Sequence, residues 1–96
     1  MHARVTKTYV DTSRIEEARK LLGEIKPAVE QVEGLQFWFA TADEESGEGI
    51  TIAIYNTKES AGAAAGTARE LMGSFSELFT QAPEVAEYDV EEFWVR

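Results

Sequence analysis

Hydrophobic and polar residues alternate along four short stretches of the chain, as they do in β-strands with two different faces. The alternation, with an excess of β-branched and aromatic residues, predicts strands over Ala3–Val10, Leu35–Ala42, Ile50–Tyr55 and Val85–Val95. The third stretch is the clearest, because its three isoleucines share one face. In the second stretch the leucine and both phenylalanines fall on one face, with the tryptophan on the other.

Apolar residues spaced three and four apart predict a helix between the first two strands. The stripe consists of Ile15, Ala18, Leu22, Ile25, Val29 and Val32. Ser13 and Glu16 fit a capping box, which predicts that the helix begins there, and Gly34 is a natural terminator. Pro27 falls inside the stripe, where its ring clashes with the carbonyl four residues earlier, but that residue is Gly23, which lets the backbone shift. We therefore expect one continuous helix that bends near this pair.

A second helix is predicted over Lys58–Thr80, with Thr57 as its N-cap. Its apolar stripe is Ala61, Ala64, Ala68, Leu71, Phe75 and Leu78. The first half reads AGAAAG, so its side chains are small. We expect these residues either to let the helix approach the sheet or to leave room for a ligand.

The resulting order of strand, helix, strand, strand, helix, strand is typical of the ferredoxin-like α+β fold. Right-handed crossovers then place both helices on one face of a four-stranded antiparallel sheet. A chain of 96 residues, 44% of them hydrophobic, suits one globular domain, so we expect residues 1–96 to form a single domain.

The sheet face away from the helices is expected to be polar if water covers it, yet both faces of the predicted strands are apolar. The face opposite the isoleucines carries Trp38, Ala53 and Tyr55. A large exposed apolar face marks an interface, which predicts a homodimer packed sheet on sheet, with Trp38 and Tyr55 in the contact. The alternative is that these two aromatic residues lie under loops of the same chain.

Charge and composition exclude several classes of function. The chain has 9 basic and 18 acidic residues, a net charge of −9, so we expect no nucleic-acid partner. It has no cysteine, which excludes disulfides and thiolate chemistry. No apolar run approaches the length of a membrane span, and the first ten residues lack the apolar core of a signal peptide. These features predict a cytoplasmic protein without a membrane partner.

Three segments, Ile25–Ala40, Ile50–Ala61 and Glu84–Phe93, carry a resemblance to the antibiotic biosynthesis monooxygenase-like domains of the dimeric α+β barrel superfamily, and this resemblance spans nearly the whole chain. The resemblance implies that the sheets of two subunits pack back to back and that a pocket lies between each sheet and its helices. The family includes cofactor-free oxygenases that act on aromatic polyketides or quinols, haem-degrading enzymes, and members with no known activity.

The chain also departs from that family in residues that bear on chemistry. Tyr55 stands where many members have a tryptophan, and the second predicted helix has no histidine. The only histidine, His2, is near a terminus that we expect to fray. The resemblance also implies that a haem-degrading member has an asparagine on its first strand, and this chain has none there. These departures argue against haem and against a histidine base, so we expect no cofactor.

The acidic residues suggest no metal site. The turn DEESGEG does not have the ligand spacing of a calcium loop, so we expect a solvated turn and no metal. The acidic residues of the last strand, which include Glu87, are instead expected to form cross-strand pairs with Arg4 and Lys7 of the first strand.

The candidate ligand-binding residues are aromatic or polar side chains that suit a small apolar pocket. They are Tyr9, Trp38, Tyr55, Asn56 and Phe75, with Arg69 as a further polar group. Each also has a structural interpretation: the aromatic residues pack in a core or interface, Asn56 is a turn or cap residue, and Arg69 is a solvated charge.

Two functions from different classes follow from these observations. The first is a small monooxygenase-like enzyme of unknown substrate that oxidises an aromatic or quinol-type molecule without a cofactor, which the family resemblance favours. The second is a non-catalytic dimeric domain that binds a small molecule or serves as a structural partner. The missing helix histidine favours the second. The catalytic residues are not identified by the sequence.

Overall fold

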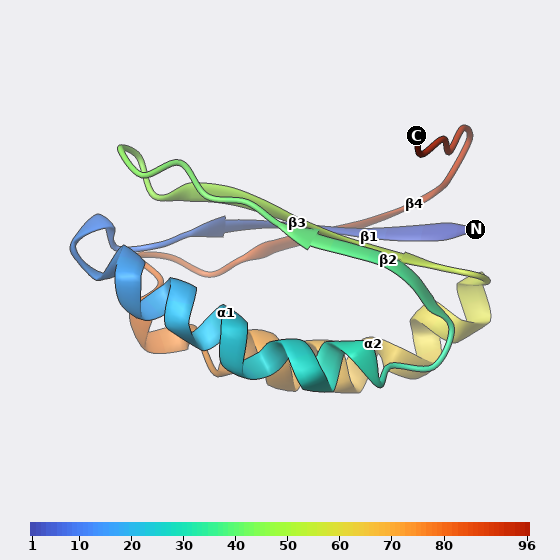
Figure 1. The fold of residues 1–96 in the computed structure, drawn as a ribbon, viewed down its shortest axis with the longest axis horizontal. Coiled ribbons are helices and arrows are strands. Elements are labelled where there is room, and N and C mark those ends of the chain that lie inside the picture. The colour runs from blue at the N-terminus through green and yellow to red at the C-terminus, as the bar shows by residue number, and fades with distance from the viewer.

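The computed structural model describes residues 1–96 and contains four strands, two helices and two short 3-10 turns. In chain order these are β1 His2–Tyr9, a 3-10 turn Thr12–Arg14, α1 Ile15–Glu30, β2 Leu35–Ala40, β3 Glu48–Tyr55, α2 Lys58–Gly73, a 3-10 turn Ser76–Leu78 and β4 Glu84–Asp89. The strands form one antiparallel sheet in the order β2-β3-β1-β4. Both helices lie on the same side of it (Figure 1). The predicted ferredoxin-like α+β fold is confirmed.

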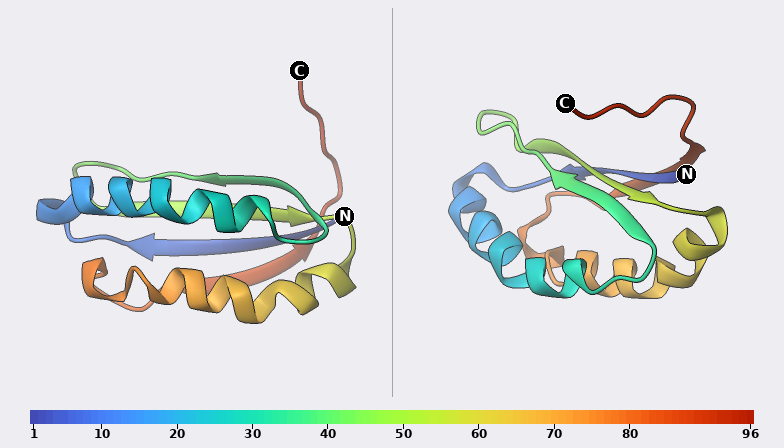
Figure 2. Two further views of the ribbon diagram at one scale, coloured as in Figure 1. Left: turned by 60° about the horizontal axis from the view of Figure 1, so that its bottom comes forward. Right: turned by 45° about the vertical axis from the view of Figure 1, so that its right-hand side comes forward.

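Two elements end well before the residue that the sequence pattern predicts. Helix α2 stops at Gly73 rather than Thr80, and after a turn at Ser74 one 3-10 turn carries Leu78 into the core. Strand β4 stops at Asp89 rather than Val95. The chain after it leaves the sheet and turns away from the helices (Figure 2). Beyond the regular elements, Leu78 still packs in the core and Phe93 packs against Phe37, whereas Trp94 and Val95 are exposed.

The start of α1 also differs from the prediction. The Asp11 carboxylate, not the Ser13 hydroxyl, caps this end: it accepts hydrogen bonds from the Ser13 amide at 3.0 Å and the Ser13 hydroxyl at 2.7 Å. The capped element is the 3-10 turn, and α1 follows from Ile15. Two other predictions are confirmed: α1 runs uninterrupted through Pro27, and Thr57 caps α2 by accepting from the Ser60 amide at 3.0 Å.

The helices cover the opposite sheet face from the one the sequence pattern suggests. Tyr55 is only 3% exposed and packs under α2, and Trp38 also faces the helices. The uncovered face carries the isoleucines of β3 and the phenylalanines of β2, so that Phe39 is 38% and Ile50 42% exposed. The prediction that Trp38 and Tyr55 lie in a contact between sheets is therefore wrong. Since both faces are apolar, hydrophobic pattern alone does not say which one meets the helices.

A β-bulge at the start of β2 moves one residue to the other face. Leu35 pairs with Tyr55, but Phe37 pairs with Ile54, so that Gln36 is an extra residue in this strand. Leu35 consequently packs beside Tyr55 on the helix side. It does not share a face with Phe37 and Phe39, as regular alternation predicts.

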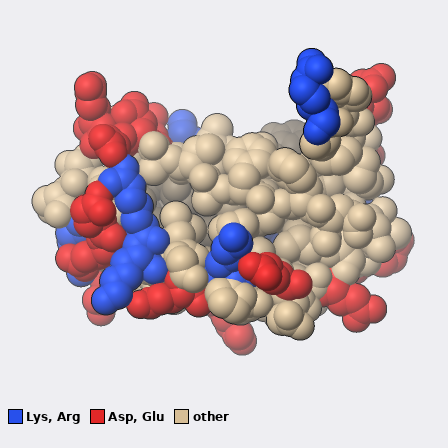
Figure 3. Space-filling model, in the orientation of Figure 1, with Lys and Arg blue, Asp and Glu red and all other residues tan.

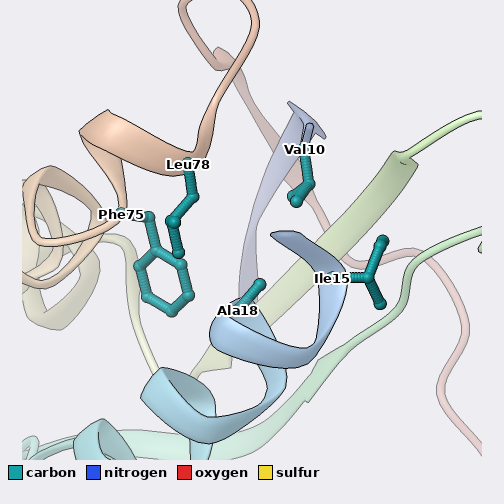
Figure 4. Close-up of a cluster of buried hydrophobic side chains, with 5 residues drawn as sticks. All are labelled: Val10, Ile15, Ala18, Phe75 and Leu78. Atoms are coloured by element: carbon teal, nitrogen blue, oxygen red, sulfur yellow. The ribbon is translucent and has the colours of Figure 1, made fainter. Parts of the chain in front are cut away.

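The apolar core consists of two small clusters at opposite ends of the space between sheet and helices. One comprises Val10, Ile15, Ala18, Phe75 and Leu78 (Figure 4). The other comprises Tyr55, Ala61 and Ala64. Only 16 of the 96 residues are buried, and no large side chain is completely enclosed. The middle of the interior is thus not filled by the chain's own side chains.

Neither helix is long and apolar enough to cross a membrane.

Candidate functional site

A cavity of about 500 Å³ lies between the sheet and the two helices, in the space that separates the core clusters. Of its 32 lining residues, 21 are hydrophobic, so it is an apolar chamber with a few polar groups. Both features fall in the range that small-molecule sites show. The cavity is therefore the candidate site.

Polar side chains on the central strand β1 form much of the cavity floor. Arg4, Thr6 and Thr8 alternate along this strand, are at most 7% exposed, and face the helices. Thr6 lies opposite Thr51 of β3, which also lines the cavity. Polar residues are unexpected on the covered face of a central strand, since burying a polar group costs free energy unless it has a hydrogen-bond partner. The alternation is visible in the sequence, from which Arg4 is predicted only to form cross-strand pairs.

The helices supply the apolar roof. Leu22, Ile25 and Val29 come from α1, while α2 contributes alanines 64, 65 and 68. A Cβ added at Gly62 or Gly66 meets no atom within 4 Å, so these glycines are not needed for close approach to the sheet. The alanines of α2 leave room in the cavity, which is one of the two outcomes predicted for the AGAAAG segment.

The most polar part of the cavity surrounds Arg4. Its Nη1 donates to the Tyr55 hydroxyl at 3.0 Å, and its Nη2 donates to the Ala61 carbonyl oxygen of α2 at 2.6 Å. Its Nε lies 3.9 Å from Oε2 of Glu87, its register partner on β4. The guanidinium also lies over the Tyr55 ring, 5.2 Å from the centroid. The predicted pairing of Arg4 with the acidic strand is thus present, with Arg4 buried and Glu87 partly exposed.

His2 adjoins this group without lining the cavity. It is 5% exposed, and its Nε2 lies 2.9 Å from Oε1 of Glu87 and its Nδ1 3.4 Å from Oδ1 of Asp89. The expectation that His2 frays is wrong, because β1 begins at His2 and sits between two strands. Glu87 therefore bridges His2 and Arg4, with its shorter contact to His2. No group of three histidine or acidic side chains is arranged to hold a metal ion.

The structure brings together three of the five predicted binding residues. Trp38, Tyr55 and Phe75 line the cavity, as does Arg69. Tyr9 lies on the uncovered face, where its hydroxyl donates to Glu84 at 3.1 Å and the Lys7 amine lies over its ring. Asn56 is exposed after β3, and its backbone amide donates to the Gly34 carbonyl oxygen. Neither Tyr9 nor Asn56 lines the cavity.

Charged side chains gather at one end of the molecule, over the β2–β3 hairpin and the start of α1 (Figure 3). There Arg19, which also lines the cavity, pairs with Glu16 and with Glu44 of the hairpin. These carboxylates, Glu44 first, raise the pKa of Arg19 above its ordinary value by accepting its hydrogen bonds. The middle of the same face is largely uncharged, in keeping with an apolar cavity beneath it.

No family model matches the chain, and no curated protein matches it in sequence. Solved structures match it closely in fold. One is a protein of Deinococcus radiodurans with the provisional name antibiotic biosynthesis monooxygenase. It matches with a TM-score of 0.78 and 14% identity, and the match covers 100% of this chain and 98% of the Deinococcus chain. A Nitrosomonas europaea protein with the same provisional name has a TM-score of 0.80 and 13% identity, with 96% and 100% covered. Another from Caulobacter crescentus has a TM-score of 0.80 and 17% identity, with 95% and 90% covered.

The chain has the antibiotic biosynthesis monooxygenase-like fold. The resemblance read from its three sequence segments is thereby confirmed over nearly the full length of the chain. At identities this low the comparison establishes the fold alone, because one fold can carry unrelated functions.

Proposed function

We propose that this protein binds an aromatic or quinol-type small molecule in the cavity and oxidises it with dioxygen, without a cofactor. The observation that carries the proposal is an unfilled cavity of about 500 Å³, apolar on most sides and lined by Trp38, Tyr55 and Phe75. Flat aromatic ligands suit such walls, since aromatic rings pack face to edge or with offset faces. The fold shared with monooxygenase-like proteins supports the same chemistry.

The chemistry proposed needs little from the protein besides binding and orientation. A quinol gives two electrons and two protons to dioxygen, which yields a quinone and hydrogen peroxide. The apolar roof holds the rings and excludes water, and the polar groups of β1 orient the oxygen atoms of the ligand. Holding reactants in a productive geometry is by itself a large source of rate enhancement.

A second function, binding without catalysis, is favoured by the ionisable side chains of the cavity. Those that line it are Arg4, Arg19, Tyr55, Arg69 and Glu87. Three are arginines, which do not act as bases at neutral pH, and no histidine is among the lining residues. A chamber of this kind binds a ligand well but offers few groups for proton transfer.

We further propose that two copies pack through the uncovered sheet face. Phe37 and Phe39 form an edge-to-face pair there, and Phe93 from the C-terminal segment packs against Phe37. Tyr88 of β4 is 59% exposed on the same side. A contiguous apolar face of this kind is unusual in a monomer. The contact proposed is the isoleucine and phenylalanine face, not the Trp38 face that the sequence pattern indicated.

Oxygen uptake and thermal shift together test the two functions. Metal-free protein is mixed with 1,4-dihydroxynaphthalene and related quinols, with a protein-free blank for autoxidation. Uptake above the blank supports oxidation, whereas a raised melting temperature without uptake supports binding alone. Absence of both effects with every compound contradicts both functions.

A matched pair of variants on α2 locates the effect. Ala68→Phe fills the cavity, whereas Ala63→Phe places the same ring on the exposed side of the same helix. The effect should disappear in the first variant and persist in the second. Equal effects in both variants would place the ligand outside the cavity.

A further inference from the structure

The polar end of the cavity has donors that the protein does not use. An arginine side chain has five N–H groups. Arg4 donates one from Nη1 to Tyr55 and one from Nη2 to Ala61, and its Nε faces Glu87. One N–H on each terminal nitrogen therefore has no partner within the protein, although the residue is only 7% exposed and lines the cavity.

The Tyr55 hydroxyl offers one more donor at the same place. Its oxygen accepts from Arg4, so its own hydrogen is free for a different acceptor. No other hydrogen bond is formed by this hydroxyl, and Tyr55 lines the cavity. Two adjacent groups, an N–H of Arg4 and the O–H of Tyr55, are thus available to one oxygen atom of a ligand.

The positive charge of Arg4 is only partly balanced. The nearest carboxylate, Glu87, lies 3.9 Å from Nε but 2.9 Å from His2, so that one carboxylate serves two cationic or donor groups. The other neighbours of the guanidinium, the Ala61 carbonyl and the Tyr55 hydroxyl, are neutral dipoles. In an apolar chamber an incompletely balanced charge attracts an anion more strongly than it does in water.

We propose that Arg4 and Tyr55 bind a single phenolic oxygen of the ligand and hold it as the anion. This inference rests on the proposed binding function and names its ligand class: a hydroxylated aromatic ring that enters with its ionisable oxygen toward β1. A carboxylate is the competing class, since one N–H on each terminal nitrogen is free and two N–H groups can hold it. For a quinol, the bound anion is the form that loses an electron to dioxygen more readily.

The test uses 2-naphthol, 2-methoxynaphthalene and 2-naphthoic acid, which share one ring system and differ in the polar group. Binding is measured by calorimetry, and the ionisation of bound 2-naphthol by its absorption spectrum. We expect naphtholate to form in the complex at a pH at which free 2-naphthol is neutral. We also expect the methyl ether to bind roughly tenfold or more weakly than 2-naphthol, because it lacks the charge-assisted hydrogen bonds.

Variants then assign the effect to the two residues. Arg4→Met should remove both the ionisation and the preference for 2-naphthol over its methyl ether, and Tyr55→Phe should weaken both. Lys7→Met is the matched control: it removes a positive charge from the same strand, but Lys7 lies over Tyr9 on the other sheet face. It should bind like the unaltered protein. The spectrum of 2-naphthol in the unaltered protein decides the matter even if Arg4→Met does not fold.

The outcomes separate this inference from the proposed function. If the naphthalenes bind but 2-naphthol stays neutral or binds no better than its methyl ether, the Arg4–Tyr55 assignment is wrong and the cavity function stands. Tighter binding of 2-naphthoic acid than of 2-naphthol would overturn the phenolic class. If none of the three compounds binds, the proposed function fails, and this inference fails with it.

Discussion

Arg4 of the central strand reaches the first turns of α2, where it donates a hydrogen bond to the carbonyl oxygen of Ala61 at 2.6 Å. Ala61 is completely buried, so this bond ties sheet and helix together from inside the molecule. The same guanidinium holds the Tyr55 hydroxyl, which makes the polar end of the cavity part of the fold as well as part of the site.

Removal of the Tyr55 hydroxyl should therefore destabilise the protein. In Tyr55→Phe one N–H of a buried arginine loses its partner, which costs about 1–3 kcal/mol. Urea unfolding followed by circular dichroism measures the loss. Thr67→Val, which removes a hydroxyl from an exposed residue of α2, is the control and should change the free energy of unfolding little. Equal values for the two variants would contradict the contribution of the Arg4–Tyr55 bond.

A charge on the uncovered sheet face should weaken the proposed dimer. Ile52 lies on that face between Val5 of β1 and Phe39 of β2. Ile52→Lys should shift the protein toward the monomer in sedimentation velocity, because a buried charge without a partner is costly. Thr67→Lys, on the exposed side of α2, should leave the association unchanged. A monomeric unaltered protein at micromolar concentration would contradict the dimer itself.

The hairpin between β2 and β3 depends on Gly47. This residue has φ of +78°, and an added Cβ would lie 2.0 Å from the Val10 carbonyl oxygen. Gly47→Ala should lower the free energy of unfolding by about 2–4 kcal/mol, through backbone strain and displacement of the chain.

The same substitution, glycine to alanine, should have the opposite effect at Gly23. It lies inside α1, and a Cβ there meets no atom within 4 Å. Gly23→Ala should raise the free energy of unfolding by about 0.5–1 kcal/mol, since alanine favours the helix. Thermal unfolding of both variants checks the pair, and a change of the same sign in each would be inconsistent with this account.

Asp11 should make folding sensitive to acid. Hydrogen bonds from the Ser13 hydroxyl and the Ser13 amide lower the pKa of its carboxyl group in the folded protein. The stabilisation is therefore present above the pKa of the unfolded chain and is lost as the pH falls through the lower pKa of the folded state. An NMR titration should show the lowered pKa, and Asp11→Asn should reduce the acid sensitivity of unfolding. An ordinary pKa for Asp11 would rule out this cap.

Much of the fold could be predicted from local pattern. Period-two alternation located all four strands, and three-four spacing located both helices, because these periods follow from backbone geometry alone. Thr57 was recognised as a cap because its hydroxyl acts on an amide three residues away. The ends of α2 and β4 were not predicted correctly, since Leu78 and Phe93 make apolar contacts outside a regular element.

The site was predicted only in part. Trp38, Tyr55 and Phe75 were chosen as aromatic residues suited to a pocket, and they do line it. Arg4 was predicted only to pair with the acidic last strand, because alternation shows that it shares a face with Thr6 and Thr8 but not what covers that face.

The sequence by itself determined the order of the elements, the antiparallel α+β architecture and the presence of two apolar sheet faces, because each depends on neighbours within a few residues along the chain. Only the tertiary structure decided which face the helices cover. That choice depends on how segments distant in the chain pack together, and it places Arg4 and Tyr55 inside a cavity while leaving Phe39 and Ile50 exposed. When both faces of a sheet are apolar, the hydrophobic pattern cannot tell which one is covered. The packing of segments distant in the chain decides it.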